Sequence, residues 1–177
     1  IHRGIPVHFV PAAEGVVWLE SFAKPNAPRA ATIAISHVQF WNGCRQDLAA
    51  FGAIKDDRHL IVSASQSAGA LPIDVHGMGV DGLASAGHKW LCAGYGAGFV
   101  YIRRELLEKK SPKHIGWMSV EDPFEFENRT YRLLPTAARH ELGTPSWGAI
   151  FALGAAIDYW TNVGKELVVT RILELSR

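Results

Sequence analysis

A single lysine, Lys89, stands in the stretch SAGHKWLCAGYGAGFVY (residues 85–101), among small and apolar residues and ahead of three alternate glycines. An ammonium group is costly in apolar surroundings, so a lysine there is expected either at a loop surface or held for its chemistry. Desolvation favours the uncharged amine, which is the nucleophile that forms a Schiff base with an aldehyde. Lys89 is therefore the first candidate for catalysis.

Two other kinds of site compete with a Schiff-base lysine. A dinucleotide-binding glycine loop needs a strand before its glycines and a helix after them, whereas residues 99–104 (FVYIRR) have the pattern of a strand. A metal site would draw on the eight histidines, but none has the HExxH pattern or a His/Cys ligand spacing. No metal is expected, and the lysine remains the best supported centre.

The composition bounds what the chain can bind. Its 177 residues are 48% hydrophobic and 20% charged, which is typical of one well-buried globular domain. The net charge is +1 and the basic residues are scattered, which argues against nucleic acid as a partner. Cys44 and Cys92 form no CxxC pair, and the chain shows no membrane-spanning run and no signal peptide. A cytoplasmic protein without a membrane partner is expected.

Short β-branched segments alternate with helical patterns along the chain. Strands are predicted over residues 5–10, 31–36, 60–62, 78–87 and 96–104. Helices are predicted over residues 45–57, 103–110, 147–164 and 165–177. This alternation predicts an α/β fold with a mainly parallel sheet.

Two segments outside the sheet also carry expectations. The helix over 147–164 is expected to turn one apolar face inward, formed by Ile150, Leu153, Gly154 and Ile157. Residues 111–139 lose periodicity and are rich in proline, asparagine and aromatic residues. A long irregular excursion of this kind is often functional, and it is expected here at a subunit interface.

Four motifs follow one another in a characteristic order: ISHVQFWNGCRQDL, LIVSASQSAGALPIDV, GVDGLASAGHKWLCAGYGAGFVYIRREL and ARHELGTPSW. In this order they resemble the core of the class V aminotransferase family of fold type I pyridoxal-phosphate (PLP) enzymes. That family also includes cysteine desulfurases, kynureninases and isopenicillin epimerase-like proteins. The similarity runs from about Ala31 to near the C-terminus, and it implies a three-layer PLP-transferase-like large domain that is normally dimeric.

The resemblance implies roles for individual residues. Lys89 would form the Schiff base with PLP, His88 would contact the cofactor phosphate, and Gln66 would hydrogen-bond the phenolic oxygen. Tyr95 lies near the position that reaches the phosphate of the neighbouring subunit. Arg139 matches the arginine that grips the substrate carboxylate, a task suited to a planar fork of donors.

The sequence departs from the family at three positions. The family usually reads D-x-x-Q, with the aspartate paired to the pyridine nitrogen, and that position is Ser63 here. A carboxylate keeps the nitrogen protonated, whereas a hydroxyl only hydrogen-bonds, so weaker carbanion stabilisation is expected.

Phe40 replaces the asparagine of the desulfurase H-V-S-N segment, which argues against a close desulfurase and makes Phe40 a substrate-binding candidate. Cys92 does not match the desulfurase cysteine.

The sequence thus predicts one domain over residues 1–177, part of a PLP-dependent transferase large domain that is incomplete at both ends. Residues 165–177 are expected to begin a helix leading toward a missing C-terminal domain. The family's phosphate loop and ring-stacking residue are expected to precede the first strand. The predicted function is PLP-dependent chemistry at the Cα of an amino acid, amino transfer first. A racemase, epimerase or lyase, and a PLP-fold binding protein without turnover, are the alternatives. Amino acids, keto acids and a second copy of the chain are the expected partners.

Overall fold

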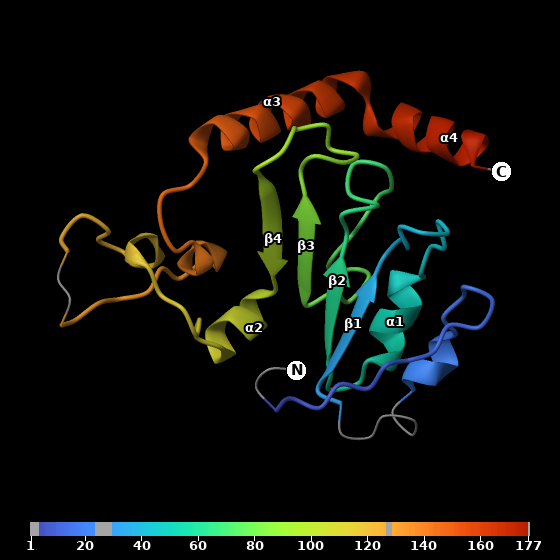
Figure 1. Cartoon of the computed structure of the whole chain (residues 1–177), viewed down its shortest axis with the longest axis horizontal. Coiled ribbons are helices and arrows are strands. Elements are labelled where there is room, and N and C mark those ends of the chain that lie inside the picture. The colour runs from blue at the N-terminus through green and yellow to red at the C-terminus, as the bar shows by residue number, and fades with distance from the viewer. Residues whose placement is uncertain (1–3, 24–29, 127–128, 177) are drawn as a thin grey trace.

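A sheet of four strands forms the centre of the molecule (Figure 1). The strands β1 (Thr32–Ser36), β2 (His59–Ser63), β3 (Gly82–Ala86) and β4 (Gly98–Ile102) lie side by side in that order. The first three are parallel, and β4 runs antiparallel to β3. This computed structural model describes residues 4–23, 30–126 and 129–176. The predicted α/β class and mainly parallel sheet are confirmed.

The hydrophobic core lies between one face of the sheet and the helix α1 (Leu48–Ile54). Side chains on a strand alternate between its two faces, and in β2 the buried apolar residues Leu60 and Val62 alternate with less buried ones. The strands contribute Ile33, Leu60, Val62 and Leu83 to the buried set, α1 contributes Leu48 and Phe51, and the loops contribute Ala64, Ala68 and Val80. Each of the side chains larger than alanine contributes about 1.5–3 kcal/mol when fully buried. The alternate residues Ser63 and Ala84 lie on the opposite face and are exposed.

Polar groups fix α1 at both ends. The side chain of Asp47 caps its start by accepting a hydrogen bond of 3.1 Å from the Ala50 amide. At the other end the buried guanidinium of Arg58 donates to the carbonyls of Ile54 and Phe22, each at 2.7 Å. These carbonyls have no partner within the helix, so the arginine satisfies them and holds the preceding segment against α1.

A buried ion cluster closes the edge of the sheet where β2 and β3 begin. Asp81 pairs with Lys55 and with Arg103, whose Nε lies 3.0 Å from Oδ1, and it accepts a hydrogen bond of 2.9 Å from the Leu60 amide. Burial raises the pKa of Asp81, but the hydrogen bonds from Lys55 and Leu60 and the two positive charges lower it more. The pKa of this carboxyl therefore lies below its usual value.

Close packing ties the excursion after α2 (Arg104–Lys109) to the segment that contains Arg139. The buried Ser119 hydroxyl accepts from the Gly116 amide at 3.1 Å and donates to the Glu141 carbonyl at 2.8 Å. A Cβ at Gly116 would lie 1.6 Å from the Leu142 carbonyl oxygen, so only glycine fits there. The described residues of the segment 111–139, which are 111–126 and 129–139, are otherwise irregular, as predicted, with short 3-10 turns at Trp117–Ser119 and Ala137–His140.

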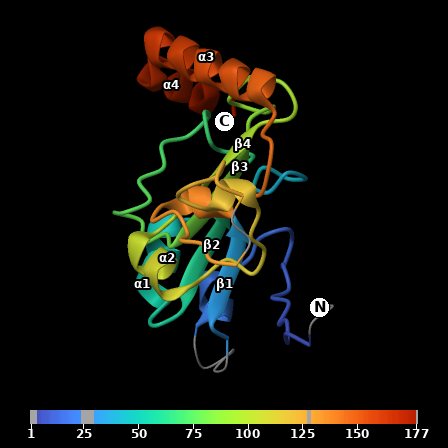
Figure 2. The same ribbon diagram turned by 90° about the vertical axis from the view of Figure 1, so that its left-hand side faces the viewer.

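Two helices, α3 (Trp147–Val163) and α4 (Lys165–Leu175), run across the edge of the sheet at which β1, β2 and β3 end (Figures 1 and 2). Both lie where the sequence predicts them, and the helix break falls at Gly164, with φ +91°. Residue 177, the last of the predicted helix, lies outside the described residues. No described helix is both long enough and apolar enough to cross a membrane.

The predicted inward face of α3 is wrong in part. Leu153 is buried and lies 3.4 Å from the position of a Cβ on Gly87, but Ile150, Gly154 and Ile157 are exposed. Within the described residues Leu153 and Ala149 of α3 lie against the loop after β3, and Leu153 is the one residue of the predicted face that is buried.

The strand predicted over residues 5–10 is also wrong. The segment has no regular structure, and its apolar side chains Ile5, Val7 and Phe9 are exposed. A strand needs a neighbouring strand to take its backbone hydrogen bonds, and none of the described residues pairs with this segment. β-branched composition alone was an insufficient signal.

Candidate active site

The carboxyl ends of the three parallel strands meet at one edge of the sheet. Ser63 is the last residue of β2, and Gln66 lies in the turn that follows it. β3 ends at Ala86, and His88 and Lys89 come directly after it. Open parallel sheets bind their ligands at this edge. The structure therefore brings these four sequence-predicted residues, Ser63, Gln66, His88 and Lys89, to one place.

Lys89 occupies a hydrogen-bonded turn that projects from the end of β3. The Ala93 amide donates to the Gly87 carbonyl and the Cys92 amide donates to the Lys89 carbonyl, each at 2.9 Å. The Lys89 side chain is exposed, and within the described residues its ammonium makes no hydrogen bond or ion pair. The expected apolar burial of this side chain is not found, because the turn leads the chain beyond the core. The amine is left free to react.

The turns that carry Gln66 and Lys89 are packed against one another. A Cβ at Gly69, whose φ is +92°, would lie 2.7 Å from the Trp90 carbonyl oxygen. The Ser65 hydroxyl accepts a hydrogen bond of 3.1 Å from the Ala86 amide at the end of β3. Sequence reasoning missed both contacts, and a glycine three residues after Gln66 was the one available signal.

His88 and Tyr95 form an aromatic stack beside Lys89. Their ring centroids are 4.8 Å apart and the interplanar angle is 26°. Gly94 and Gly96 have φ values of +71° and +98°, which favour glycine, and they turn the loop back so that Tyr95 reaches the histidine. Tyr95 is 85% exposed. Its predicted reach to a neighbouring subunit stays a prediction.

The chain after β1 brings two further residues to the same edge. Phe40 is 81% exposed in the loop that follows β1, and its role at the substrate stays a prediction. His37 is buried, and its Nδ1 has no hydrogen-bond partner among the described residues. Burial, and then the positive charge of Arg45, lower the pKa of His37 to about 4, so its imidazole is uncharged at neutral pH. Nothing in the sequence indicated this burial.

Arg139 is not brought to this edge. Its Nε donates to the Leu134 carbonyl at 2.8 Å and its Nη1 donates to the Leu107 carbonyl of α2 at 3.2 Å. Because β4 runs antiparallel to β3, α2 begins at the opposite edge of the sheet from Lys89 (Figure 1). In this arrangement the guanidinium holds the excursion against α2. The predicted grip on a substrate carboxylate has no support in this placement.

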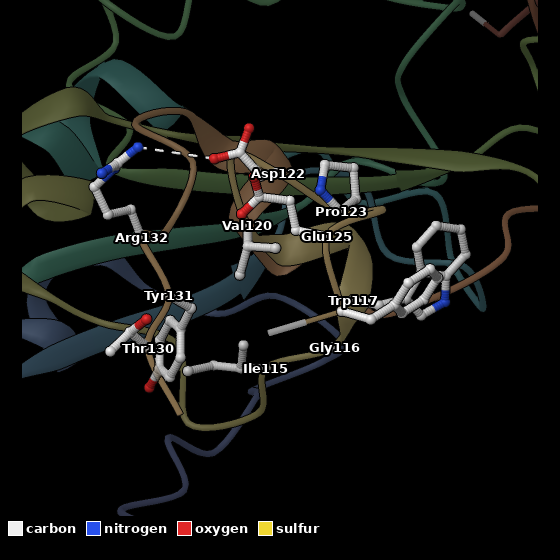
Figure 3. Close-up of a pocket in the computed structure, with 11 residues that line it drawn as sticks. Ile115, Gly116, Trp117, Val120, Asp122, Pro123, Glu125, Thr130, Tyr131 and Arg132 are labelled. Atoms are coloured by element: carbon white, nitrogen blue, oxygen red, sulfur yellow. Dashed lines mark ion pairs between the residues drawn. The ribbon is translucent and has the colours of Figure 1, made fainter. Parts of the chain in front are cut away.

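A cavity of about 490 Å³ is lined by residues of the excursion after α2 (Figure 3). Trp117 and Tyr131 line it, as does Arg132, whose guanidinium pairs with Glu121 at 2.6 Å and with Asp122 at 3.7 Å. It contains none of the predicted site residues. Cavity size therefore does not mark the reactive centre.

The side chains at the Lys89 edge have the chemistry that PLP requires, with one exception. A free amine can condense with the aldehyde, the imidazole of His88 can meet the phosphate, and the amide of Gln66 can donate to the phenolic oxygen. Segments 36–40, 63–67 and 86–91, which end and follow the three strands, contain no aspartate or glutamate. The set therefore fits the cofactor but offers no carboxylate to its ring nitrogen.

The chain is similar to known proteins in sequence and in fold. The chain is 32% identical over 165 residues to an uncharacterized aminotransferase of Bacillus subtilis, covering 92% of this chain and 43% of that protein. The structure superimposes on the apo cysteine desulfurase of Thermococcus onnurineus with a TM-score of 0.77 and 31% identity, over 90% of this chain and 40% of that one. A mutant of the cystine C-S lyase C-DES, with glycine covalently linked to its PLP cofactor, matches with a TM-score of 0.77 and 25% identity, over 86% of this chain and 41% of that one.

The similarity extends over the whole chain although it spans only part of each relative. The chain corresponds to about 40% of the length of the proteins it matches. The family model described as aminotransferase class-V matches residues 2–177. With the sheet edge, the lysine turn and this match in agreement, the chain belongs to the PLP-dependent class-V aminotransferase family.

Proposed function

We propose that the chain forms part of a PLP-dependent enzyme that acts at the Cα of an amino acid, with Lys89 as its Schiff-base residue. The observation that carries the proposal is the unpartnered amine of Lys89 at the carboxyl end of β3, beside the turns of Gln66 and His88. Bound PLP supplies an electron sink for the bond that is broken at Cα. The Lys89 amine would take the Cα proton and return it.

The neighbouring residues orient the cofactor. His88 binds a phosphate oxygen, and its stack on Tyr95 holds the imidazole plane in place. Gln66 donates to the phenolic oxygen without adding a charge. The close packing of Gly69 against Trp90 holds the two turns together, so the amide of Gln66 and the amine of Lys89 can contact the same cofactor.

Amino transfer between an amino acid and a keto acid is the first candidate reaction, and the relative in Bacillus subtilis supports it. A lyase is the second candidate, because Ser63 places a hydroxyl where a strong electron sink would need a carboxylate. A homodimer is proposed as the assembly in which either reaction takes place.

The test is spectroscopic. Protein incubated with PLP is expected to develop a visible absorption band that borohydride abolishes, and amino acids are expected to bleach that band. Keto-acid release upon bleaching separates an enzyme from a protein that binds PLP without turnover. A protein that gains no reducible band when PLP is added would contradict the proposal.

Arg139→Lys is expected to lower stability by about 1–2 kcal/mol, because one ammonium cannot reach the carbonyls of both Leu134 and Leu107 as the guanidinium does. Urea unfolding measures this loss. Arg171→Lys is the control, since Arg171 is exposed and pairs only with Glu174. A sharp rise in KM for amino acids at unchanged stability would instead restore the predicted role of Arg139 in binding the substrate carboxylate.

A further inference from the structure

Ser63 ends the strand that lies between two parallel neighbours, and its hydroxyl is unused. The side chain is exposed, and no described residue hydrogen-bonds its Oγ. In the sheet Ser63 is paired with Ser36 of β1 and with Ala84 of β3. Residues in register present their side chains on the same face, so this part of the edge offers hydroxyls and a methyl group. It is polar but uncharged.

The segments that end and follow the three parallel strands, residues 36–40, 63–67 and 86–91, contain no carboxylate. The first carboxylate after the Gln66 turn is Asp74, which accepts from the amides of His76 and Gly77 at 3.1 and 3.0 Å in its own turn. His37, at the end of β1, is uncharged at neutral pH for the reasons given above. Within residues 36–40, 63–67 and 86–91 the other titratable side chains are His88 and Lys89, and both become cations when they are protonated.

We infer that the Ser63 hydroxyl is the partner of the pyridine nitrogen of bound PLP and that this nitrogen is uncharged at neutral pH. The inference rests on the proposed function. In PLP the nitrogen is para to the carbon that bears the aldehyde, so a cofactor joined to Lys89 directs its nitrogen away from the lysine turn. A hydroxyl can donate to an unprotonated nitrogen, whereas an adjacent anion is needed to favour the protonated one.

An uncharged ring changes which reactions at Cα are easy. Amino transfer requires the ring to hold the electron pair of the broken Cα–H bond until a proton is returned to the cofactor. In β-elimination that pair forms a Cα–Cβ double bond while the leaving group departs with the electrons of its own bond. The amino acid and one water then become a 2-oxo acid, ammonium and the protonated leaving group. Compared with a site that offers the ring nitrogen a carboxylate, this site therefore shifts the balance from amino transfer toward elimination of a leaving group on Cβ.

The protonation state can be read without turnover. Nitrogen-15 NMR of the protein loaded with PLP labelled at the ring nitrogen is expected to show an uncharged pyridine. Ser63→Asp is expected to move the resonance to the position of a pyridinium. Ser111→Asp, which adds the same charge at an exposed position after α2 and away from this edge, is the matched control and is expected to leave the resonance in place. Ser63→Ala is expected to keep the nitrogen uncharged but to shift its resonance through the lost hydrogen bond.

An activity measurement tests the same inference independently. With β-chloroalanine as the probe, the ratio of elimination to amino transfer is expected to fall on the order of tenfold or more in Ser63→Asp, because the charged ring stabilises the electron pair that amino transfer must store. Alanine, which has no leaving group, reports amino transfer alone.

A pyridinium resonance in the unsubstituted protein would overturn the inference. So would a resonance that neither Ser63→Asp nor Ser63→Ala changes, and if the aspartate variant fails to fold, the alanine variant alone decides. These outcomes leave the proposed function standing. A protein in which borohydride attaches no pyridoxyl group to Lys89 removes the proposed function, and the inference with it.

Discussion

Replacing Lys89 with alanine is expected to abolish the reducible PLP band completely. The band requires a covalent bond between the aldehyde and an uncharged amine, and alanine has no amine. Lys89 is the lysine at the carboxyl edge of the parallel strands, where its ammonium is free of partners among the described residues. Absorbance before and after borohydride, followed by peptide mass spectrometry, measures the effect.

Lys113→Ala provides the control for this experiment. Lys113 is exposed in the excursion after α2, far along the chain from the strand ends, so its loss should leave the band intact. The assignment fails if the pyridoxyl group is found on a different lysine. PLP that stays bound without a covalent link to the alanine variant would show that the remaining contacts hold the cofactor by themselves.

Asp81→Asn is expected to cost about 3–5 kcal/mol of stability at neutral pH. The carboxylate is 6% exposed and neutralises both Lys55 and Arg103, and an asparagine would leave two partly buried cations without an anion. Urea unfolding at pH 7 gives the difference. Asp47→Asn is the control, because asparagine caps a helix about as well as aspartate.

The pH dependence of stability gives a second readout for Asp81. Its pKa is lowered in the folded state, so its contribution is present above the unfolded pKa of about 3.9 and is lost as the pH falls through the lower folded value. The parent protein should therefore lose more stability on acidification through this window than Asp81→Asn does. Equal losses, or a difference between the two proteins below about 1 kcal/mol at pH 7, would show that the cluster does not stabilise the fold.

Local patterns in the sequence were enough to predict most elements of the fold. Leu48 and Phe51 at helical spacing indicated α1, and the alternating strands indicated the parallel sheet. The prediction of a strand over residues 5–10 failed because a strand depends on a neighbouring strand, which composition does not reveal. The prediction that Ile150 faces inward failed for the same reason, since long-range packing decides whether an apolar face is covered.

The candidate site was predictable where motif order coincides with strand ends. Gln66 and Lys89 follow consecutive parallel strands, so topology places them at one edge. The role of Arg139 stays a prediction, because it follows β4, whose antiparallel direction carries the chain to the other edge. The direction of β4 and the burial of His37 are tertiary properties, and no local signal in the chain encodes them.

The antiparallel return of β4 also has a consequence for the order of folding. Ala86 pairs with Gly98 across the lysine loop, a shorter closure than the one that pairs Thr32 with His59. Short loops lose less entropy on closing, and hairpins form faster than parallel pairs joined by crossovers. Pulse-labelled hydrogen exchange is expected to protect the amides of β3 and β4 before those of β1, and simultaneous protection would contradict this order. The turn that presents Lys89 is thus expected to form before the strands beside it have assembled.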